Sequence, residues 1–251
     1  LDLDIYQEID VDNRNDADFD NRITSVTNTG FNIARYNSGL AGIGTGNAGV
    51  DIEIENMANA NQTAIASALD TSIEAGNSST GACSDNEVEI DIKDKIFVDN
   101  RNDADIDNRV TVNSNTGYNR VEMNSSDPCS GSGCGSASFI ETGDTVGQVS
   151  ISNNVNTNQT EISSGGPVDI IAGNECTGAN SDNSVSVDSY SKTVVNNKNN
   201  ADINNNVNVQ TNTGNNTSAY NLGSSAISTG DSSVVFGISN QANANSTEIG
   251  N

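Results

Sequence analysis

The chain of 251 residues contains no histidine, no tryptophan and only two prolines, and aromatic residues make up 4% of it. Without histidine, the Ser–His and Cys–His arrangements of nucleophilic enzymes are excluded. Because large aromatic side chains dominate thick globular cores, we expect instead a thin core that repeats along an axis. The scarcity of proline and the regular spacing of β-branched residues argue against a disordered acidic chain.

Basic side chains are also scarce: 10 Lys and Arg stand against 34 Asp and Glu, which gives a formal net charge of -24. Such a surface repels phosphate groups, so a simple nucleic-acid binder is excluded. The same repulsion disfavours anionic membranes. We expect the charge to keep a β-rich chain soluble until salt or divalent cations screen it.

Long apolar runs are missing as well. No segment approaches the ~18 apolar residues of a transmembrane helix, so we expect no membrane insertion. No signal peptide is visible, but the chain starts at Leu1, which is also the start of a sequence repeat. We interpret this start as the processed N-terminus of an exported protein, located outside the cell or on its surface.

A threefold internal repeat covers the sequence. Val11–Asp18 and Val98–Asp105 both read VDNRNDAD, and Val195–Asp202 reads VNNKNNAD. An Asn-Thr-Gly sequence follows each segment at the same distance and predicts a turn. The matches define repeat 1 as residues 1–87, repeat 2 as 88–184, with a cysteine-containing insertion near 125–134, and repeat 3 as 185–251, which is truncated at its C-terminal end.

Apolar residues alternate with polar ones at the start of each repeat. In repeat 1, Leu1, Leu3 and Ile5 alternate with Asp2 and Asp4. This period of two is typical of a half-buried strand with an acidic outer face. Further short strands are expected at residues 18–26, 31–37, 50–56, 71–75 and 168–172.

Two all-β architectures fit this pattern. In a β-solenoid, equivalent Asn residues of the three tandem repeats stack into amide ladders. In the alternative, each repeat of about 87 residues folds as a small β-sandwich module. The lack of an aromatic-rich core favours the solenoid.

Asp residues at alternate positions resemble the D-x-D spacing of calcium-binding loops and make calcium a possible ligand. The residues concerned are Asp12, Asp16, Asp18, Asp20, Asp99, Asp103, Asp105 and Asp107. Repeat 3 has Asn at most of the equivalent positions, which favours the alternative of a solvated acidic face. In that case nearby arginines pair with it, namely Arg14, Arg22, Arg101 and Arg109.

Four cysteines, Cys83, Cys129, Cys134 and Cys176, predict disulfides in an oxidising compartment. A zinc site would need C-x-x-C spacing or histidine. Four cysteines allow three connectivities, and bonds within or between chains both remain open.

Asn-x-Ser/Thr sequences are glycan acceptors in exported proteins. Here they are Asn61, Asn77, Asn124, Asn158, Asn215, Asn216 and Asn245. Three of them, Asn61, Asn158 and Asn245, are equivalent in the repeats, so they fit turn or ladder positions equally well.

The segments NDADIDN (Asn102–Asn108) and NNADINN (Asn199–Asn205) resemble curlin-type repeats of bacterial functional amyloid. The composition is also similar to that of Asn/Thr/Gly-rich subunits of extracellular filaments and cell sheaths. This resemblance implies secretion, stacking of β-strands and self-assembly.

We expect a non-enzymatic structural subunit of an extracellular fibre, sheath or surface layer, because the carboxylates recur periodically whereas a catalytic site is singular. The rival hypothesis is an adhesin stalk or a glycan- or ice-binding solenoid. Head-to-tail homopolymers are expected, since unpaired strand edges invite pairing with another chain. The predicted assembly strand presents Leu1, Leu3, Ile5, Ile9 and Val11 to a neighbour.

Overall fold

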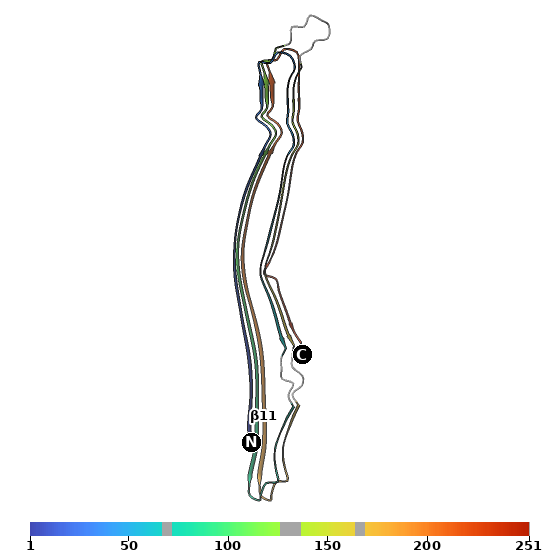
Figure 1. Cartoon of the computed structure of the whole chain (residues 1–251). Helices are drawn as coiled ribbons and strands as arrows, with labels where there is room; N and C mark the ends of the chain where they lie inside the picture. The colour runs from blue at the N-terminus through green and yellow to red at the C-terminus, as the bar shows by residue number, and fades with distance from the viewer. Residues whose placement is uncertain (67–71, 126–136, 164–168, 251) are drawn as a thin grey trace.

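A computed structural model of the chain describes residues 1–66, 72–125, 137–163 and 169–250. Over these ranges the chain is all-β, with no helix. Two layers of strands run side by side and form a long, narrow rod (Figure 1). The predicted β-solenoid is confirmed. The alternative of tandem β-sandwich modules is wrong, because each strand pairs with the equivalent strand of another repeat.

Each repeat forms one rung of the solenoid, which runs out along one sheet and back along the other. The long outgoing strands are β1 (Asp2–Asn28), β6 (Asp85–Asn115) and β11 (Asp182–Asn212). Beyond them, β2 (Ile33–Arg35), β7 (Arg120–Glu122) and β12 (Thr217–Ala219) lead to the tip where the chain reverses.

The returning strands complete each rung. In rung 1 they are β3 (Ala41–Gly44), β4 (Ala48–Ala66) and β5 (Ser72–Ser78), and in rung 2 β8 (Ala137–Glu141), β9 (Thr145–Ser163) and β10 (Asp169–Glu175). In rung 3 they are β13 (Ser224–Ser228), β14 (Ser232–Ala242) and β15 (Asn245–Ile249).

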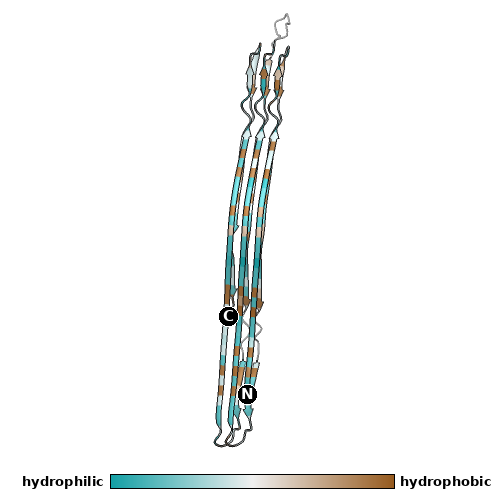
Figure 2. Ribbon diagram, turned by 90° about the vertical axis from the view of Figure 1, so that its left-hand side faces the viewer, coloured by the Kyte–Doolittle hydropathy of each residue, from teal (hydrophilic) through white to brown (hydrophobic). Residues whose placement is uncertain are grey.

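All pairing is parallel and follows the sequence repeat. In the outgoing sheet, β1 pairs with β6 at an offset of 87 residues; the first pair is Asp2 with Glu89 and the last is Asn28 with Asn115. Strand β6 pairs with β11 at an offset of 97 residues. Figure 2 shows the three long strands side by side. Every side chain therefore lies beside its own equivalent in the next rung.

The register also locates the insertion of repeat 2. The offset is 87 between β2 and β7 but 97 between β3 and β8, so the extra residues fall between β7 and β8. That stretch includes Cys129 and Cys134, which lie outside the described residues.

The strands are much longer than the sequence indicates. β1 has 27 residues and β6 has 31, and the VDNRNDAD segment lies in the middle of each. The prediction of short strands joined by turns was wrong here, because the Asn residues that normally favour turns have their amides satisfied inside ladders. Within that segment Val11, Asn13 and Asn15 point inward, while Asp12 and Arg14 point outward.

The Asn-Thr-Gly sequence forms a kink and does not reverse the chain. The Thr29 hydroxyl donates to the Gly46 carbonyl at 3.1 Å, and Thr116 donates in the same way to Gly143 at 2.9 Å, so outgoing and returning segments bend together. A Cβ on Gly117 would lie 2.0 Å from the Gly214 carbonyl oxygen, so only glycine permits the rungs to stack here.

Apolar side chains and amides alternate in blocks along the thin core. One cluster contains Ile54, Val110 and Ile151, and a second, further toward the N-terminus of the outgoing strands, contains Val98 and Ile162. Blocks of buried Asn lie between these clusters. Because the layer is one side chain thick on each sheet, aliphatic residues fill it without large aromatics.

Two networks of six amides hold the sheets together in these blocks. The first joins Asn15, Asn102 and Asn199 of the outgoing sheet to Asn61, Asn158 and Asn245 of the returning sheet. The second joins Asn21, Asn108 and Asn205 to Asn56, Asn153 and Asn240. In both networks the Nδ2 atom donates to Oδ1 of the next rung, at 2.7–3.2 Å. The predicted Asn ladders are confirmed.

We predict that Asn108→Ala destabilises the protein strongly. Asn108 is fully buried, accepts from Asn21 and Asn56, and donates to Asn153 and Asn205. Its removal orphans buried donors that cost about 1–3 kcal/mol each. Urea denaturation should show a loss in that range or above.

The matched control is Asn208→Ala, on the exposed outer face of β11. It should change the free energy of unfolding by less than about 0.5 kcal/mol. Equal effects of the two substitutions would contradict a stabilising role for the interior amides.

Candidate functional site

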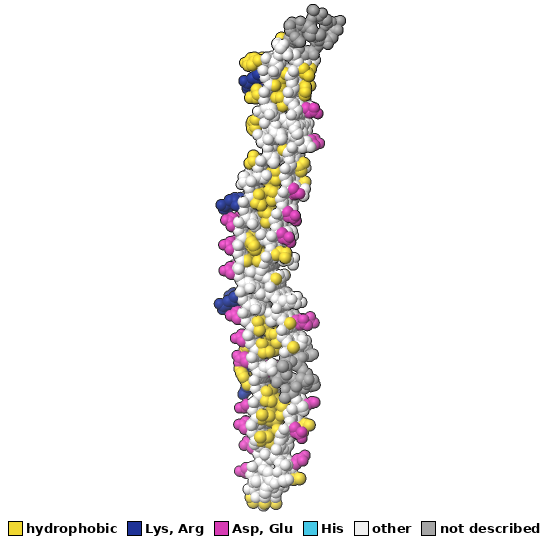
Figure 3. Space-filling model, in the orientation of Figure 1, with side chains coloured by type: hydrophobic (Ala, Val, Ile, Leu, Met, Phe, Trp, Pro, Cys, Tyr) yellow, Lys and Arg dark blue, Asp and Glu magenta, His cyan; other side chains and the backbone are white. Residues whose placement is uncertain are grey.

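The outer face of the outgoing sheet carries columns of like charge. Register pairing places Asp12 beside Asp99, and Asp18 beside Asp105 and Asp202. Adjacent strands lie about 4.8 Å apart, so carboxylates in one column repel each other. Figure 3 shows acidic side chains along both margins of one side of the rod, with an apolar stripe between them.

Arginines in the same strands offset part of this charge, as the sequence predicts. Arg14 lies 3.3 Å from Asp12, and Arg101 lies 2.5 Å from Asp99. Arg22 and Arg109 contact the carboxylates two residues before them in the same way. The hydrogen bond to Asp99, aided by the carboxylate's charge, raises the pKa of Arg101 above its ordinary value, so the guanidinium stays charged.

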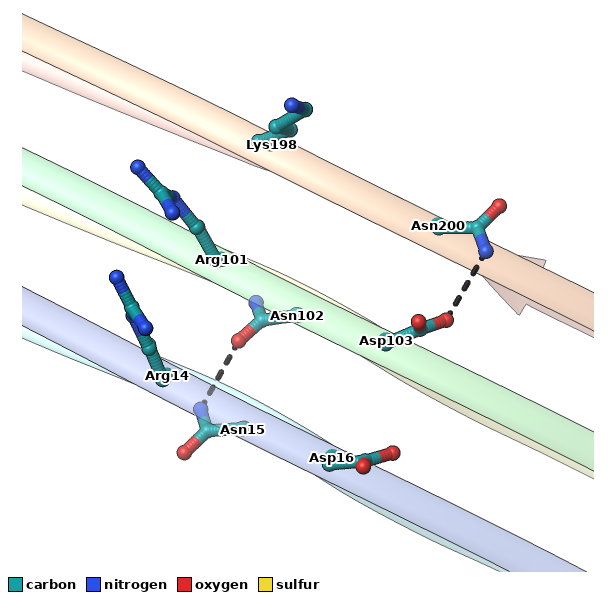
Figure 4. A pocket seen from close by; sticks show the side chains of 8 residues that line it. All are labelled: Arg14, Asn15, Asp16, Arg101, Asn102, Asp103, Lys198 and Asn200. Carbon is teal, nitrogen blue, oxygen red and sulfur yellow. Dashed lines mark hydrogen bonds between the residues drawn. The ribbon is translucent and has the colours of Figure 1, made fainter.

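A cation column lies next to an acidic one. Arg14, Arg101 and Lys198 form the first, and Asp16 and Asp103 form the second, where Asn200 takes the third place (Figure 4). The Asn200 amide donates to Asp103 at 3.0 Å. Rung 3 thus ends this acidic column with a neutral donor.

Two further acidic columns end in the same way. Asn196 donates to Asp99 at 3.3 Å, and Asn204 donates to Asp107 at 3.4 Å. The amides of repeat 3, which weakened the calcium interpretation at the sequence level, therefore serve as hydrogen-bond partners of the carboxylates in rung 2.

The predicted calcium ligands lie on straight strands and do not form a loop. Asp12, Asp16, Asp18 and Asp20 all point outward along β1, and their equivalents, Asp99, Asp103, Asp105 and Asp107, do the same along β6. Among the described residues, no group of three or more acidic, cysteine or histidine side chains is close enough to hold a metal ion. The D-x-D spacing reflects strand alternation, and calcium binding stays a prediction.

Cys83 and Cys176 are exposed free thiols that form no disulfide with each other. Disulfides that involve Cys129, Cys134 or another chain stay a prediction, because Cys129 and Cys134 lie outside the described residues. Cys83 and Cys176 both lie at the turn that joins one rung to the next. The Cys83 amide donates to the Ala179 carbonyl, and the Ser79 amide donates to the Glu175 carbonyl. Because Glu175 is in register with Ser78, Cys176 lies beside Ser79. The register therefore places the two cysteines four positions apart along the stacked turns.

The predicted glycan acceptors are mostly ladder residues. Asn124 and Asn158 are 2% exposed, so a glycan on either would occupy the core. Asn61, Asn77 and Asn216 are half-buried in ladders, and Asn245 accepts a hydrogen bond from Asn158. Asn215 alone of the seven is exposed and outside the ladders, which leaves it the acceptor best placed for modification.

Two features near the tip lie outside the sequence predictions. Phe31 and Tyr118 stack with ring centroids 4.9 Å apart beside a groove of about 660 Å³. Glu122 is a buried carboxylate 3.5 Å from Arg35 of rung 1, and Arg120 also contacts it. The signal for this ion pair was that Arg35 and Glu122 occupy the same repeat position with opposite charges.

The predicted assembly strand belongs to the protein's own core. Leu3 and Ile5 pack against one core cluster, and Ile9 and Val11 pack against another, while Leu1 is exposed. One edge of this strand pairs with β6. Its other edge is unpaired among the described residues, as is the outer edge of β11. Docking of this strand on a neighbour stays a prediction, and its backbone edge is the part left for a partner.

We predict that a maleimide reagent labels Cys83 and Cys176 without prior reduction, because both thiols are exposed. Peptide mapping of the unreduced, labelled protein measures this. A Cys83→Ser, Cys176→Ser variant is the control for the assigned peptides. Recovery of a Cys83–Cys176 disulfide would contradict the register of the turns.

We also predict that salt stabilises the folded chain, since its acidic columns repel one another. Raising NaCl from ~10 mM to ~150 mM shortens the Debye length from about 30 Å to about 8 Å, so the melting temperature should rise. Calcium at equal ionic strength, compared with excess chelator, isolates specific binding. Identical melting curves in calcium and in chelator would mean that the Asp columns are solvated faces that bind no calcium specifically.

Comparisons with known proteins give no indication of the function, so it has to be inferred from the chain's own residues. No protein-family model matches the chain, no curated protein matches its sequence, and no solved structure matches its fold. Over the part of the chain that the structure describes, no helix is long and apolar enough to cross a membrane. The features that the structure offers are therefore the acidic columns, the aromatic groove and the two unpaired sheet edges.

Proposed function

We propose that this protein is a non-enzymatic structural subunit of an extracellular fibre, sheath or surface layer, and that it works by self-assembly. The single observation that carries the proposal is the open outgoing sheet, whose order β1-β6-β11 leaves a long strand at each side. Unpaired strands of this length are pairing templates that monomeric proteins usually blunt or cover.

The interior supports the same proposal. Rung 1 and rung 3 present equivalent inward-facing residues, such as Asn15 and Asn199, or Asn21 and Asn205, because all rungs follow one repeat. A further rung from another chain can thus continue both the amide ladders and the apolar clusters. Solenoids of this kind gain stability from each added neighbour contact.

The proposed extracellular location has support from the sequence and from one exposed residue. It depends on the resemblance to curlin-type repeats, on the high acidic charge and on the exposed Asn215 in an Asn-x-Thr sequence. The exposed thiols of Cys83 and Cys176 give it no support, because they form no disulfide with each other.

A second candidate function is that of a glycan-binding stalk, and the aromatic groove favours it. Stacked Phe31 and Tyr118 offer flat apolar rings, and Asn28, Asn115 and Gln210 line the same groove with amides. Aromatic faces combined with polar groups suit ligands that are apolar on one side and polar on the other. An ice-binding role has no comparable support.

We predict that the purified full-length chain forms ordered polymers once its charge is screened. Electron microscopy and sedimentation across a series of NaCl and calcium concentrations provide the measurement. Growth of filaments or sheets with salt supports the structural role. Monomers that persist under all conditions and bind immobilised glycans through Phe31 and Tyr118 would support the second candidate and overturn the first.

A further inference from the structure

Three amide ladders in the core of the outgoing sheet share one direction, whereas the ladder of Asn28, Asn115 and Asn212 at the kink runs the opposite way. In the core, Asn13, Asn15 and Asn21 of rung 1 each donate Nδ2 to the equivalent residue of rung 2, and rung 2 donates to rung 3. Among the described residues, no hydrogen bond reaches the Oδ1 atoms of these three rung 1 amides. At these three positions the β1 edge therefore presents acceptors.

The opposite edge presents donors. Each Asn amide has two N–H groups, and in rung 2 one reaches across to the returning sheet while the other reaches the next rung. In rung 3, Asn197 Nδ2 contacts Thr247 and Asn205 Nδ2 contacts Asn240, and no described residue receives the second N–H of either amide. Asn199 differs, because its Nδ2 donates both to Asn245 and to the Asn156 carbonyl. The donor edge of β11 is thus complementary to the acceptor edge of β1.

Charge is distributed along the same axis. Residues 1–87 contain 15 acidic and 3 basic side chains, whereas residues 185–251 contain 4 and 2. Pairing of β1 with a second β1 would join two strongly acidic rungs. Pairing of β11 with β1 joins an acidic rung to a nearly neutral one, so electrostatics favour unlike edges.

The Asp–Asn columns on the outer face indicate which residues of β11 and of a second β1 would lie side by side. Asn196, Asn200 and Asn204 each use one N–H for an Asp of rung 2. A second N–H on each amide is available for a carboxylate on the other side. If another β1 were placed beyond β11 in the same register, Asp12, Asp16 and Asp20 would lie beside these amides.

Resting on the proposed self-assembly, we propose that the partner is a second copy of this chain, whose β1 edge pairs in parallel with the β11 edge at an offset of 184 residues. Asn13 then meets Asn197, Asn15 meets Asn199 and Asn21 meets Asn205, so equivalent amides stay in register across the junction, and Asn197 and Asn205 each have an N–H for the Oδ1 of the next chain. The contact is heterologous and does not close, which produces a polymer that grows along the ladder axis.

A charge-swap experiment tests this register. The full-length variant Asn196→Asp, Asn200→Asp, Asn204→Asp places Asp beside Asp at each junction and should raise the critical concentration for polymerisation about tenfold. Adding Asp12→Asn, Asp16→Asn and Asp20→Asn in the same chain restores the Asp–Asn junction and should return the critical concentration to near that of the wild type.

The swapped chain is matched to the wild type within one chain, whereas the triple variant has two Asp–Asp rung contacts in each of the three columns. The swapped chain has the wild-type net charge and, like the wild type, one Asp–Asp rung contact and one Asp–Asn rung contact. Circular dichroism of both variants verifies folding. If the folded triple variant polymerises like the wild type, or the swapped chain remains deficient, the register is overturned while the proposed function stands. If the wild type itself never polymerises, the proposed function fails first.

Disulfide trapping gives a second readout that needs no change in charge. Thr24 and Asn208 are exposed outer-face residues at equivalent repeat positions. A mixture of Thr24→Cys and Asn208→Cys chains, oxidised after assembly, should yield a bond between the two introduced sulfurs, because in-register neighbours lie about 5 Å apart.

The control pairs Thr24→Cys with Gln210→Cys, one pleat out of register, at about 7–8 Å. Cross-linking of the in-register pair should exceed that of the control several-fold. Equal yields, or discrete dimers in place of polymers, would overturn the proposed pairing.

Discussion

The structure depends on one constraint: a buried asparagine must find partners for two N–H groups and a carbonyl oxygen. Asn102 meets it by donating to Asn199 above and to Asn158 across the core, while it accepts from Asn15 below. Only an identical residue at an identical place in the next rung repeats this geometry. The amides therefore fix the register residue by residue, and a slip by one position would expose them and bury the carboxylates.

The same register determines the outer surface. The register that pairs the interior amides also places like charges side by side on the outer face, as at Asp18, Asp105 and Asp202. In-strand arginines and the amides of rung 3 relieve part of that repulsion. The result is a rod whose two edges differ in charge and in hydrogen-bonding character although the core asparagines of β1 and β11 occupy equivalent positions. In the proposed polymer, this difference favours association of unlike edges over association of like edges.

Sequence and structure agree most closely where both faces of a strand are constrained. The VDNRNDAD segment recurs because Val11, Asn13 and Asn15 build the core while Asp12 and Arg14 form the outer columns. The sequence also contained the signal for the Arg35–Glu122 ion pair, but its importance became visible only when the register placed them side by side.

The sequence by itself determined the all-β class, the three repeats, the offsets of 87 and 97 residues and the alternation of inner and outer side chains. All of these follow from local periodicity and from comparison of the chain with itself.

Only the tertiary structure decided that the strands run uninterrupted for up to 31 residues and that Asn-Thr-Gly marks a kink. It also decided that Asn15 faces Asn61 and that Cys83 and Cys176 stay apart. The physical reason is that Asn and Gly favour turns in isolation. The partners that hold them in extended strands come from other rungs, tens of residues away in the sequence.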